Sequence, residues 1–100
     1  MHFFLSGLDF FEDFDIVARV LAQNFDAKAL DGTDSLYYRE ILMERNNDTF
    51  TLSYNESIGL YVSIQGQSRA KVSRMERMLK EAIPLIEKIR NELYKYPNTK

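Results

Sequence analysis

The spacing of apolar residues changes twice along this chain, and this limits the folds open to it. Between residues 14 and 25 the apolar residues lie three or four apart, as in a helix with one buried face: Phe14, Val17, Ala18, Leu21 and Phe25. Residues 50–54 and 60–64 instead alternate apolar and polar side chains, which is typical of half-buried strands. Residues 72–93 return to the helical period. This order predicts two helices and an antiparallel sheet.

Turn residues mark where the strands begin and end. A short apolar run at His2–Leu5 predicts a first strand, and Gly7 supplies the bend after it. Asp31-Gly32 and the cluster 46–48 predict turns on either side of a strand at Leu36–Glu44. A further turn near residues 55–59 joins the two alternating strands.

The helix ends leave alternatives open. Asp9 or Asp13 is a candidate N-cap for the first helix. Ser68 can cap the second helix, or Ser73 can, because Ser73-Arg74-Met75-Glu76 fits a capping box. Pro84 is expected to kink this helix or to split it into two, because its ring clashes with the preceding turn.

The expected fold class is α+β. The order (β)-α-β-β-β-α predicts a two-layer sandwich in which an antiparallel sheet of three to five strands packs on two helices. The 100 residues form a single domain, 1–100, with a C-terminal tail that is frayed from about residue 96. Both helices are expected on one face of the sheet, lined by Phe50, Leu52, Tyr54, Leu60, Val62 and Ile64. The opposite face is expected to carry Thr49, Thr51, Ser53, Tyr61 and Ser63, with Tyr37 and Arg39, and is either a solvated surface or a binding surface.

The residue types argue against an enzyme. There is no cysteine to act as a nucleophile, and the one histidine, His2, lies at the start of the chain. A nucleophilic serine would therefore have only His2 as its histidine base. The four glycines are scattered through turns and do not form a phosphate-binding loop. We therefore expect no catalytic residues, no bound metal and no cofactor. The opening residues have no basic segment before the apolar ones, which favours a cytoplasmic protein without a membrane anchor.

Charge is divided unevenly between the two parts of the chain. Residues 1–64 carry 4 Lys and Arg against 11 Asp and Glu, a formal charge of −7, and residues 65–100 carry 9 against 4, a charge of +5, which together give the net −2. Such a division predicts a charged partner. Acidic residues around the first helix and the loop after it can meet a basic protein, with Tyr37, Tyr38, Phe10 or Phe11 as aromatic anchors. The candidate partner-binding residues are Asp9, Glu12, Asp13, Asp15, Asp31, Asp34, Tyr37 and Tyr38. Ordinary solvated charge is the alternative.

The second helix offers an alternative basic face: Arg69, Arg74, Arg77 and Lys80. These cations either contact phosphate or pair with carboxylates of the same domain, for which Asp13 and Asp15 are the candidates. An isoelectric point near 5.4 argues against nucleic acid.

Three segments carry a resemblance to a known class of proteins: Asp31-Gly32-Thr33-Asp34-Ser35-Leu36-Tyr37-Tyr38, Phe50-Thr51-Leu52-Ser53-Tyr54 and Gly59-Leu60-Tyr61-Val62. Lying between an acidic helix and a long C-terminal helix, they resemble small bacterial immunity proteins of toxin and immunity pairs. The resemblance implies a noncatalytic cytoplasmic protein that binds one cognate toxin, often a nuclease, and blocks its active site or its route to substrate.

Two other functions stay open. The order of helix, three strands and helix also resembles secretion chaperones of the type III class, although those usually add strands after the second helix. A chaperone or a dimeric adaptor is therefore the alternative. A small regulator that binds nucleic acid through the basic helix is the third function.

Overall fold

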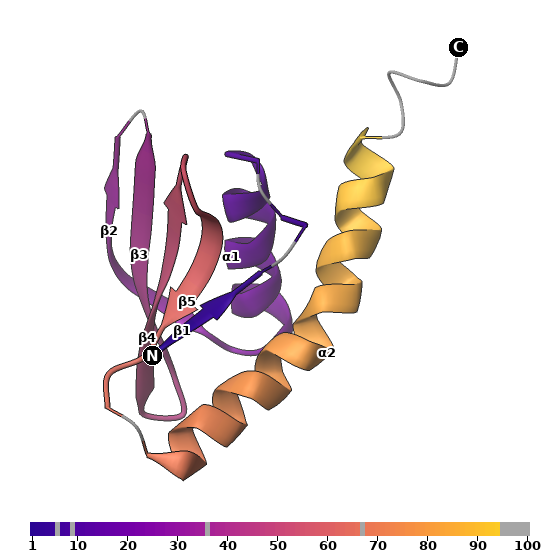
Figure 1. Ribbon diagram of the computed structural model, residues 1–100. Coiled ribbons are helices and arrows are strands. Elements are labelled where there is room, and N and C mark those ends of the chain that lie inside the picture. The colour runs from indigo at the N-terminus through magenta and orange to yellow at the C-terminus, as the bar shows by residue number, and fades with distance from the viewer. Residues whose placement is uncertain (6, 9, 36, 67, 95–100) are drawn as a thin grey trace.

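The computed structural model describes residues 1–5, 7, 8, 10–35, 37–66 and 68–94. Along the chain it has seven elements (Figure 1): β1 (His2–Phe4), α1 (Asp13–Asn24), β2 (Lys28–Asp34), β3 (Tyr38–Arg45), β4 (Asp48–Asn55), β5 (Gly59–Ser63) and α2 (Arg69–Tyr94). The predicted α+β class is confirmed. The predicted start of the third strand at Leu36 and the predicted frayed tail from residue 96 lie outside the described residues.

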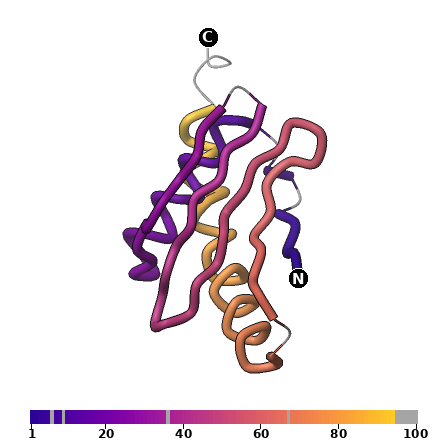
Figure 2. The backbone as a smooth tube through the Cα atoms, turned by 90° about the vertical axis from the view of Figure 1, so that its left-hand side faces the viewer, coloured from indigo at the N-terminus to yellow at the C-terminus, as the bar shows by residue number. Residues whose placement is uncertain are grey.

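The five strands form one antiparallel sheet in the order β1-β5-β4-β3-β2. Strands β2 to β5 follow one another as a meander, and β1 pairs with β5 at the far edge. Figure 2 shows the sheet in front with both helices behind it, so one face is covered and the other is open. The predicted two-layer arrangement is therefore confirmed.

The core lies between the sheet and the two helices. Leu52 of β4 is fully buried and pairs across the sheet with Ile41 of β3 and Val62 of β5. The helices contribute one face each, as their apolar spacing predicts: Phe14, Ile16, Val17, Val20 and Leu21 from α1, and Met75, Met78, Leu79, Ala82 and Ile86 from α2. All six residues predicted to line the covered face, from Phe50 to Ile64, are buried.

Two hairpin turns follow from residues that tolerate positive φ. Asn46 and Asn47 have φ of 52° and 68°, as both central residues of a type I′ turn require. At the other turn Asn55 accepts a hydrogen bond from the Ser57 N–H at 2.8 Å, and Gly59 has a φ of 94°. Both turns lie where the sequence predicts them.

The prediction of a turn at Asp31-Gly32 was wrong. Both residues lie inside β2, which pairs with β3 and has a register shift between Ala29 and Asp31. Every residue of β2 is exposed, so its sequence shows no alternation between apolar and polar residues. A Cβ atom on Gly32 would lie 3.2 Å from the Glu40 carbonyl oxygen, which favours glycine in this strand.

The structure shows which residues cap the two helices. Ser68 precedes α2, and its Oγ accepts a hydrogen bond from the Lys71 N–H at 3.5 Å, whereas Ser73 lies inside the helix. The prediction of Asp13 as the N-cap of α1 was wrong, because Glu12 is the N-cap and Asp13 is the first helical residue; the other candidate, Asp9, lies outside the described residues. Helix α2 continues through Pro84 without a break and bends along its length in Figure 1.

The β3 side chains on the open face of the sheet differ from those predicted, which included Arg39. Arg39 pairs with Tyr54, and opposite residues of an antiparallel pair share a face, so Arg39 points toward the helices. Tyr38 and Glu40 lie on the open face instead. The prediction for Arg39 was wrong because the register of β3 against β4 decides which face each side chain takes, and this register places Arg39 opposite Tyr54 of the core.

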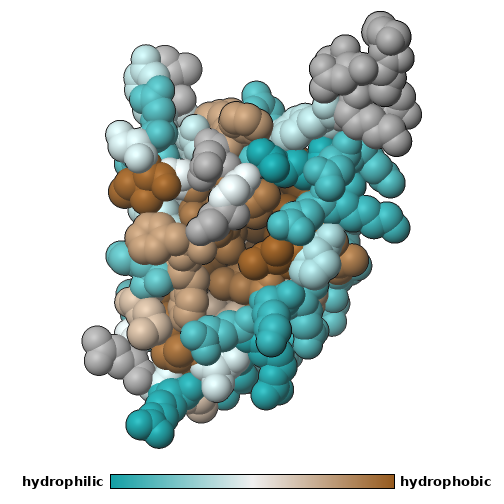
Figure 3. Space-filling model, turned by 45° about the vertical axis from the view of Figure 1, so that its right-hand side comes forward, coloured by the Kyte–Doolittle hydropathy of each residue, from teal (hydrophilic) through white to brown (hydrophobic). Residues whose placement is uncertain are grey.

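Polar side chains cover the outer side of α2, and apolar ones gather over β1 and β5 (Figure 3). Among the described residues, no helix has the length and apolar character needed to cross a membrane.

Candidate functional site

Three segments that are far apart in the sequence meet at one end of the sheet, uppermost in Figure 1: residues 10–15, the loop between β2 and β3, and the turn between β4 and β5. We call this region the acidic end. The Glu56 N–H donates to the Tyr37 carbonyl at 3.2 Å, which ties the β4–β5 turn to the β2–β3 loop. The backbone thus fixes Tyr37 and Glu56 next to each other.

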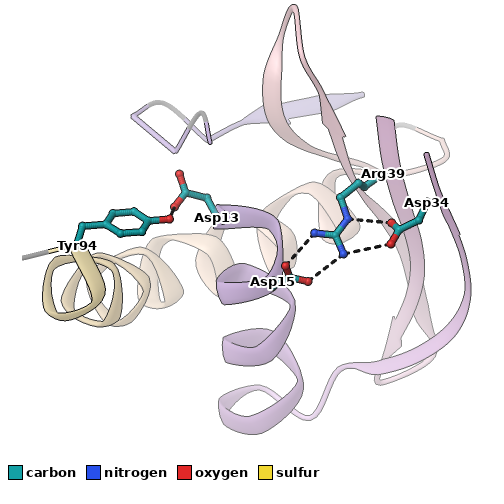
Figure 4. Close-up of polar contacts among 5 residues, drawn as sticks. All are labelled: Asp13, Asp15, Asp34, Arg39 and Tyr94. Atoms are coloured by element: carbon teal, nitrogen blue, oxygen red, sulfur yellow. Dashed lines mark hydrogen bonds and ion pairs between the residues drawn. The ribbon is translucent and has the colours of Figure 1, made fainter. Parts of the chain in front are cut away.

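Arg39 joins α1 to the edge of the sheet (Figure 4). Its guanidinium donates to both Asp15 oxygens at 2.9 and 3.0 Å, and to both Asp34 oxygens at 2.8 and 3.3 Å. The hydrogen bonds to Asp15, together with those to Asp34, raise the pKa of Arg39 above its ordinary value even though burial lowers it. One cation therefore holds two carboxylates, and the trio keeps a formal charge of −1.

The guanidinium of Arg39 is also covered by aromatic rings. Its central carbon lies 4.6 Å from the centroid of Phe11 and 4.4 Å from that of Phe14. Only 11% of the Arg39 side chain is exposed, against 60% for Asp15 and 65% for Asp34. The acidic end therefore presents carboxylates to solvent and encloses the cation beneath them.

A surface hollow of about 390 Å³ lies beside this cluster, lined by Phe11, Glu12, Tyr37, Tyr54 and Glu56. Phe11 and Tyr54 meet edge to face, with centroids 5.7 Å apart. Tyr37 is 58% exposed and Phe11 is 37% exposed, which is high for large aromatic side chains. We call this feature the aromatic hollow.

Asp13 does not belong to the exposed surface, and its assignment as a partner-binding residue was wrong. It is fully buried, and it accepts hydrogen bonds from the Phe10 N–H, from Arg90 Nε at 3.0 Å and from the Tyr94 hydroxyl at 3.2 Å. Figure 4 shows Tyr94 of α2 reaching Asp13 at the start of α1. Burial, followed by the nearby Asp13 charge, raises the pKa of Tyr94. Asp13 therefore connects the two helices.

The structure brings together only part of the predicted binding set. Glu12 and Tyr37 line the aromatic hollow, and Asp15 and Asp34 flank Arg39 beside it. Asp31 is exposed on the edge strand, where it accepts the Gly32 N–H at 2.8 Å. Tyr38 lies on the open face, and its pKa is raised because its hydroxyl donates to the Glu40 carboxylate. Asp9 lies outside the described residues.

Sequence reasoning missed two residues of this end. Tyr54 was assigned to the core by its alternation, and it is 7% exposed but also lines the hollow. Glu56 lies in the predicted turn at residues 55–59, and the alternating pattern gives no sign of which turn residues face α1. Only the pairing of strands brings these two residues next to Phe11.

The positive charge of the basic face of α2 is paired with a carboxylate of β4, and not with the acidic residues of α1 as we expected. Arg74 donates to Asp48 of β4 at 2.6 and 3.0 Å, and its hydrogen bonds hold the pKa of Asp48 below its usual value. The expected partners Asp13 and Asp15 contact Arg90 and Arg39 instead. Arg69, Arg77 and Lys80 are exposed, and Arg77 and Lys80 each have a glutamate four residues away, Glu81 and Glu76.

The open face has an aromatic group of its own at the β1–β5 edge. The ring of Tyr61 lies 5.3 Å from His2 and 5.8 Å from Phe4, and Phe4 is 60% exposed. His2 Nδ1 contacts Ser63 Oγ at 2.7 Å. This group lies on the opposite face of the sheet from Arg39.

Comparison with protein-family models, curated proteins and solved structures finds no match to this chain. The described residues contain no group of three or more His, Asp or Glu side chains placed to hold a metal ion.

Proposed function

We propose that this protein is a noncatalytic inhibitor of the immunity type, which binds a basic toxin, such as a nuclease, through the acidic end and blocks access to its active site. One observation carries the proposal. Exposed carboxylates and exposed aromatic rings occur together at this end, while its cation, Arg39, is enclosed and paired with two aspartates.

Each kind of side chain has a role in such a complex. Exposed carboxylates speed the encounter with a cationic surface. Phe11 and Tyr37 supply large rigid contact areas, which commonly account for most of the affinity of an interface. Because the partner of such an inhibitor binds phosphate or another anion, a surface that presents carboxylates competes for the same groove.

The test is affinity capture from a lysate of the source organism, followed by an activity assay of the captured protein. We expect one basic protein in a 1:1 complex, whose toxic or nuclease activity is lost on binding. Glu12→Lys should weaken capture, because it reverses a charge at the edge of the aromatic hollow.

The matched control is Glu76→Lys, which makes the same change in net charge on the exposed side of α2. Equal weakening by both substitutions would indicate a response to net charge alone and would contradict the proposed site. Recovery of nucleic acid, or of a partner that keeps full activity in the complex, would contradict the proposed function.

The open face favours a second candidate function, a chaperone or dimeric adaptor. His2 and Phe4 are exposed and Tyr61 is half-buried on a face of the sheet that neither α1 nor α2 covers. A chaperone of this kind would bind an apolar segment, so Phe4→Ser would abolish capture while Glu12→Lys would not. The nucleic-acid function has less support, since Arg74 is paired with Asp48.

A further inference from the structure

The aromatic hollow has walls suited to a flat cation. The rings of Phe11 and Tyr54 meet at 84°, so they form two nearly perpendicular sides, and the exposed ring of Tyr37 adds a third from the β2–β3 loop. The face of an aromatic ring carries partial negative charge, which attracts a cation placed over it.

Two carboxylates complete the hollow. Glu12 approaches from the start of α1 and Glu56 from the β4–β5 turn, and no lysine or arginine is among the described residues that line it. The N-terminal end of α1 carries a partial positive charge, but the full negative charge of Glu12 at its N-cap outweighs it. The Asp15, Asp34 and Arg39 trio beside the hollow adds a further net negative charge. The local field therefore favours a positive ligand.

The chain binds its own arginines in the same way at two places. Arg39 lies over Phe11 and Phe14 and pairs with aspartates. Arg90 lies 5.2 Å from the centroid of Phe10 and 5.4 Å from that of Tyr94, and it pairs with Asp13. Each site combines aromatic rings with a carboxylate around one guanidinium. The aromatic hollow offers the same combination and is open to solvent.

We infer that the aromatic hollow receives one arginine side chain of the partner protein, an inference that rests on the proposed function for the identity of its ligand. The guanidinium stacks on the exposed ring of Tyr37, lies beside Phe11, over which Arg39 already lies, and pairs with Glu12 and Glu56. Arginine fits better than lysine because its planar group stacks on rings and presents several donors in a fork.

The test uses N-acetyl-arginine methylamide as the probe, titrated into the isotope-labelled full chain at constant ionic strength and followed by NMR. We expect saturable shifts at the ring protons of Phe11, Tyr37 and Tyr54 and at the Glu56 amide. The matched probe is N-acetyl-citrulline methylamide, which has nearly the same shape without the charge and should produce no saturable shift. The lysine derivative should bind more weakly than the arginine derivative.

Variants separate the two parts of the site. Tyr37→Leu should weaken arginine binding about twofold to fivefold, because it keeps an apolar side chain but removes the ring face, whereas Tyr37→Phe should bind like the unmodified chain. Glu56→Gln should also weaken binding, and Glu76→Gln on α2 should leave it unchanged. Tyr37, Glu56 and Glu76 are all exposed, so these variants should retain the fold.

The possible results distinguish this inference from the proposed function. Equal shifts with citrulline, equal or stronger binding of the lysine derivative, or shifts centred elsewhere would overturn the arginine site. If Glu12→Lys still weakened capture of an inhibited toxin, the proposed function would stand without the arginine site. Binding of the arginine probe alone, with no inhibited partner recovered, would support the site and contradict the function.

Discussion

Arg39 and Arg90 make similar contacts but have different roles. The roles differ because the acidic partner of Arg90 is buried and those of Arg39 are exposed. Arg90 pairs with Asp13, whose side chain is 0% exposed, whereas Arg39 pairs with Asp15 and Asp34, which are mostly exposed. A buried carboxylate fixes the position of one helix against the other. An exposed one is free to meet a partner.

This difference predicts unequal effects on stability. Asp13→Ala leaves Arg90 and the Tyr94 hydroxyl without their acceptor, and loss of one partner of a buried pair costs about 3–5 kcal/mol. Asp15→Ala removes an exposed partner while Asp34 still holds Arg39, so we expect a cost of about 1 kcal/mol or less. Urea unfolding of the two variants measures both values. Similar losses for the two would contradict the assignment of Asp13 as the structural residue.

At the scale of single residues, residue type predicted that several charged side chains would form ion pairs but not which residues they would pair with. The acidic residues near the first helix were evident as a cluster, yet nothing local shows that Asp13 turns inward to Arg90, 77 residues away in sequence. Side-chain burial depends on which helix packs alongside, and this information is absent from the spacing of one element.

At the scale of elements, the spacing of apolar residues predicted the helices and strands that have one buried face. It failed for strand β2, which has no buried face. Helices α1 and α2 and strands β4 and β5 each bury a stripe, so their apolar residues recur at a fixed spacing. Strand β2 buries nothing and forms because β3 offers it a hydrogen-bonding edge. Its Asp31-Gly32 pair has strong turn character, which the pairing overrides.

The contact between β4 and α2 predicts a change of stability with pH. The hydrogen bonds from Arg74 lower the folded-state pKa of Asp48, so the stabilisation is present above the unfolded pKa, about 3.9, and is lost as pH falls through the folded value. We therefore expect Asp48→Asn to be less stable than the unmodified chain at pH 7 and the difference to shrink below about pH 3.9. Unfolding midpoints measured from neutral to acidic pH test this, and a constant difference would contradict it.

At the scale of the whole molecule, folding distributes the uneven charge of the sequence into pairs. Asp13 and Asp48, from the acidic part of the chain, contact Arg90 and Arg74 of the basic helix. Glu12 and Glu56, the carboxylates that line the aromatic hollow, form none of the ion pairs found among the described residues. Both lie at one end of the sheet. The charge pattern predicted that an acidic surface exists. Only the meeting of three distant segments determines where it lies.

The measurement that tests this account most directly is the NMR amide-shift footprint of the captured partner on the isotope-labelled chain. We predict that the largest changes fall at Phe11, Glu12, Tyr37 and Glu56, with the open face around Phe4, Thr51 and Tyr61 unaffected. A footprint centred on the open face would contradict the acidic end as the binding site and would favour a chaperone or adaptor. A footprint along Arg69, Arg77 and Lys80 would contradict both.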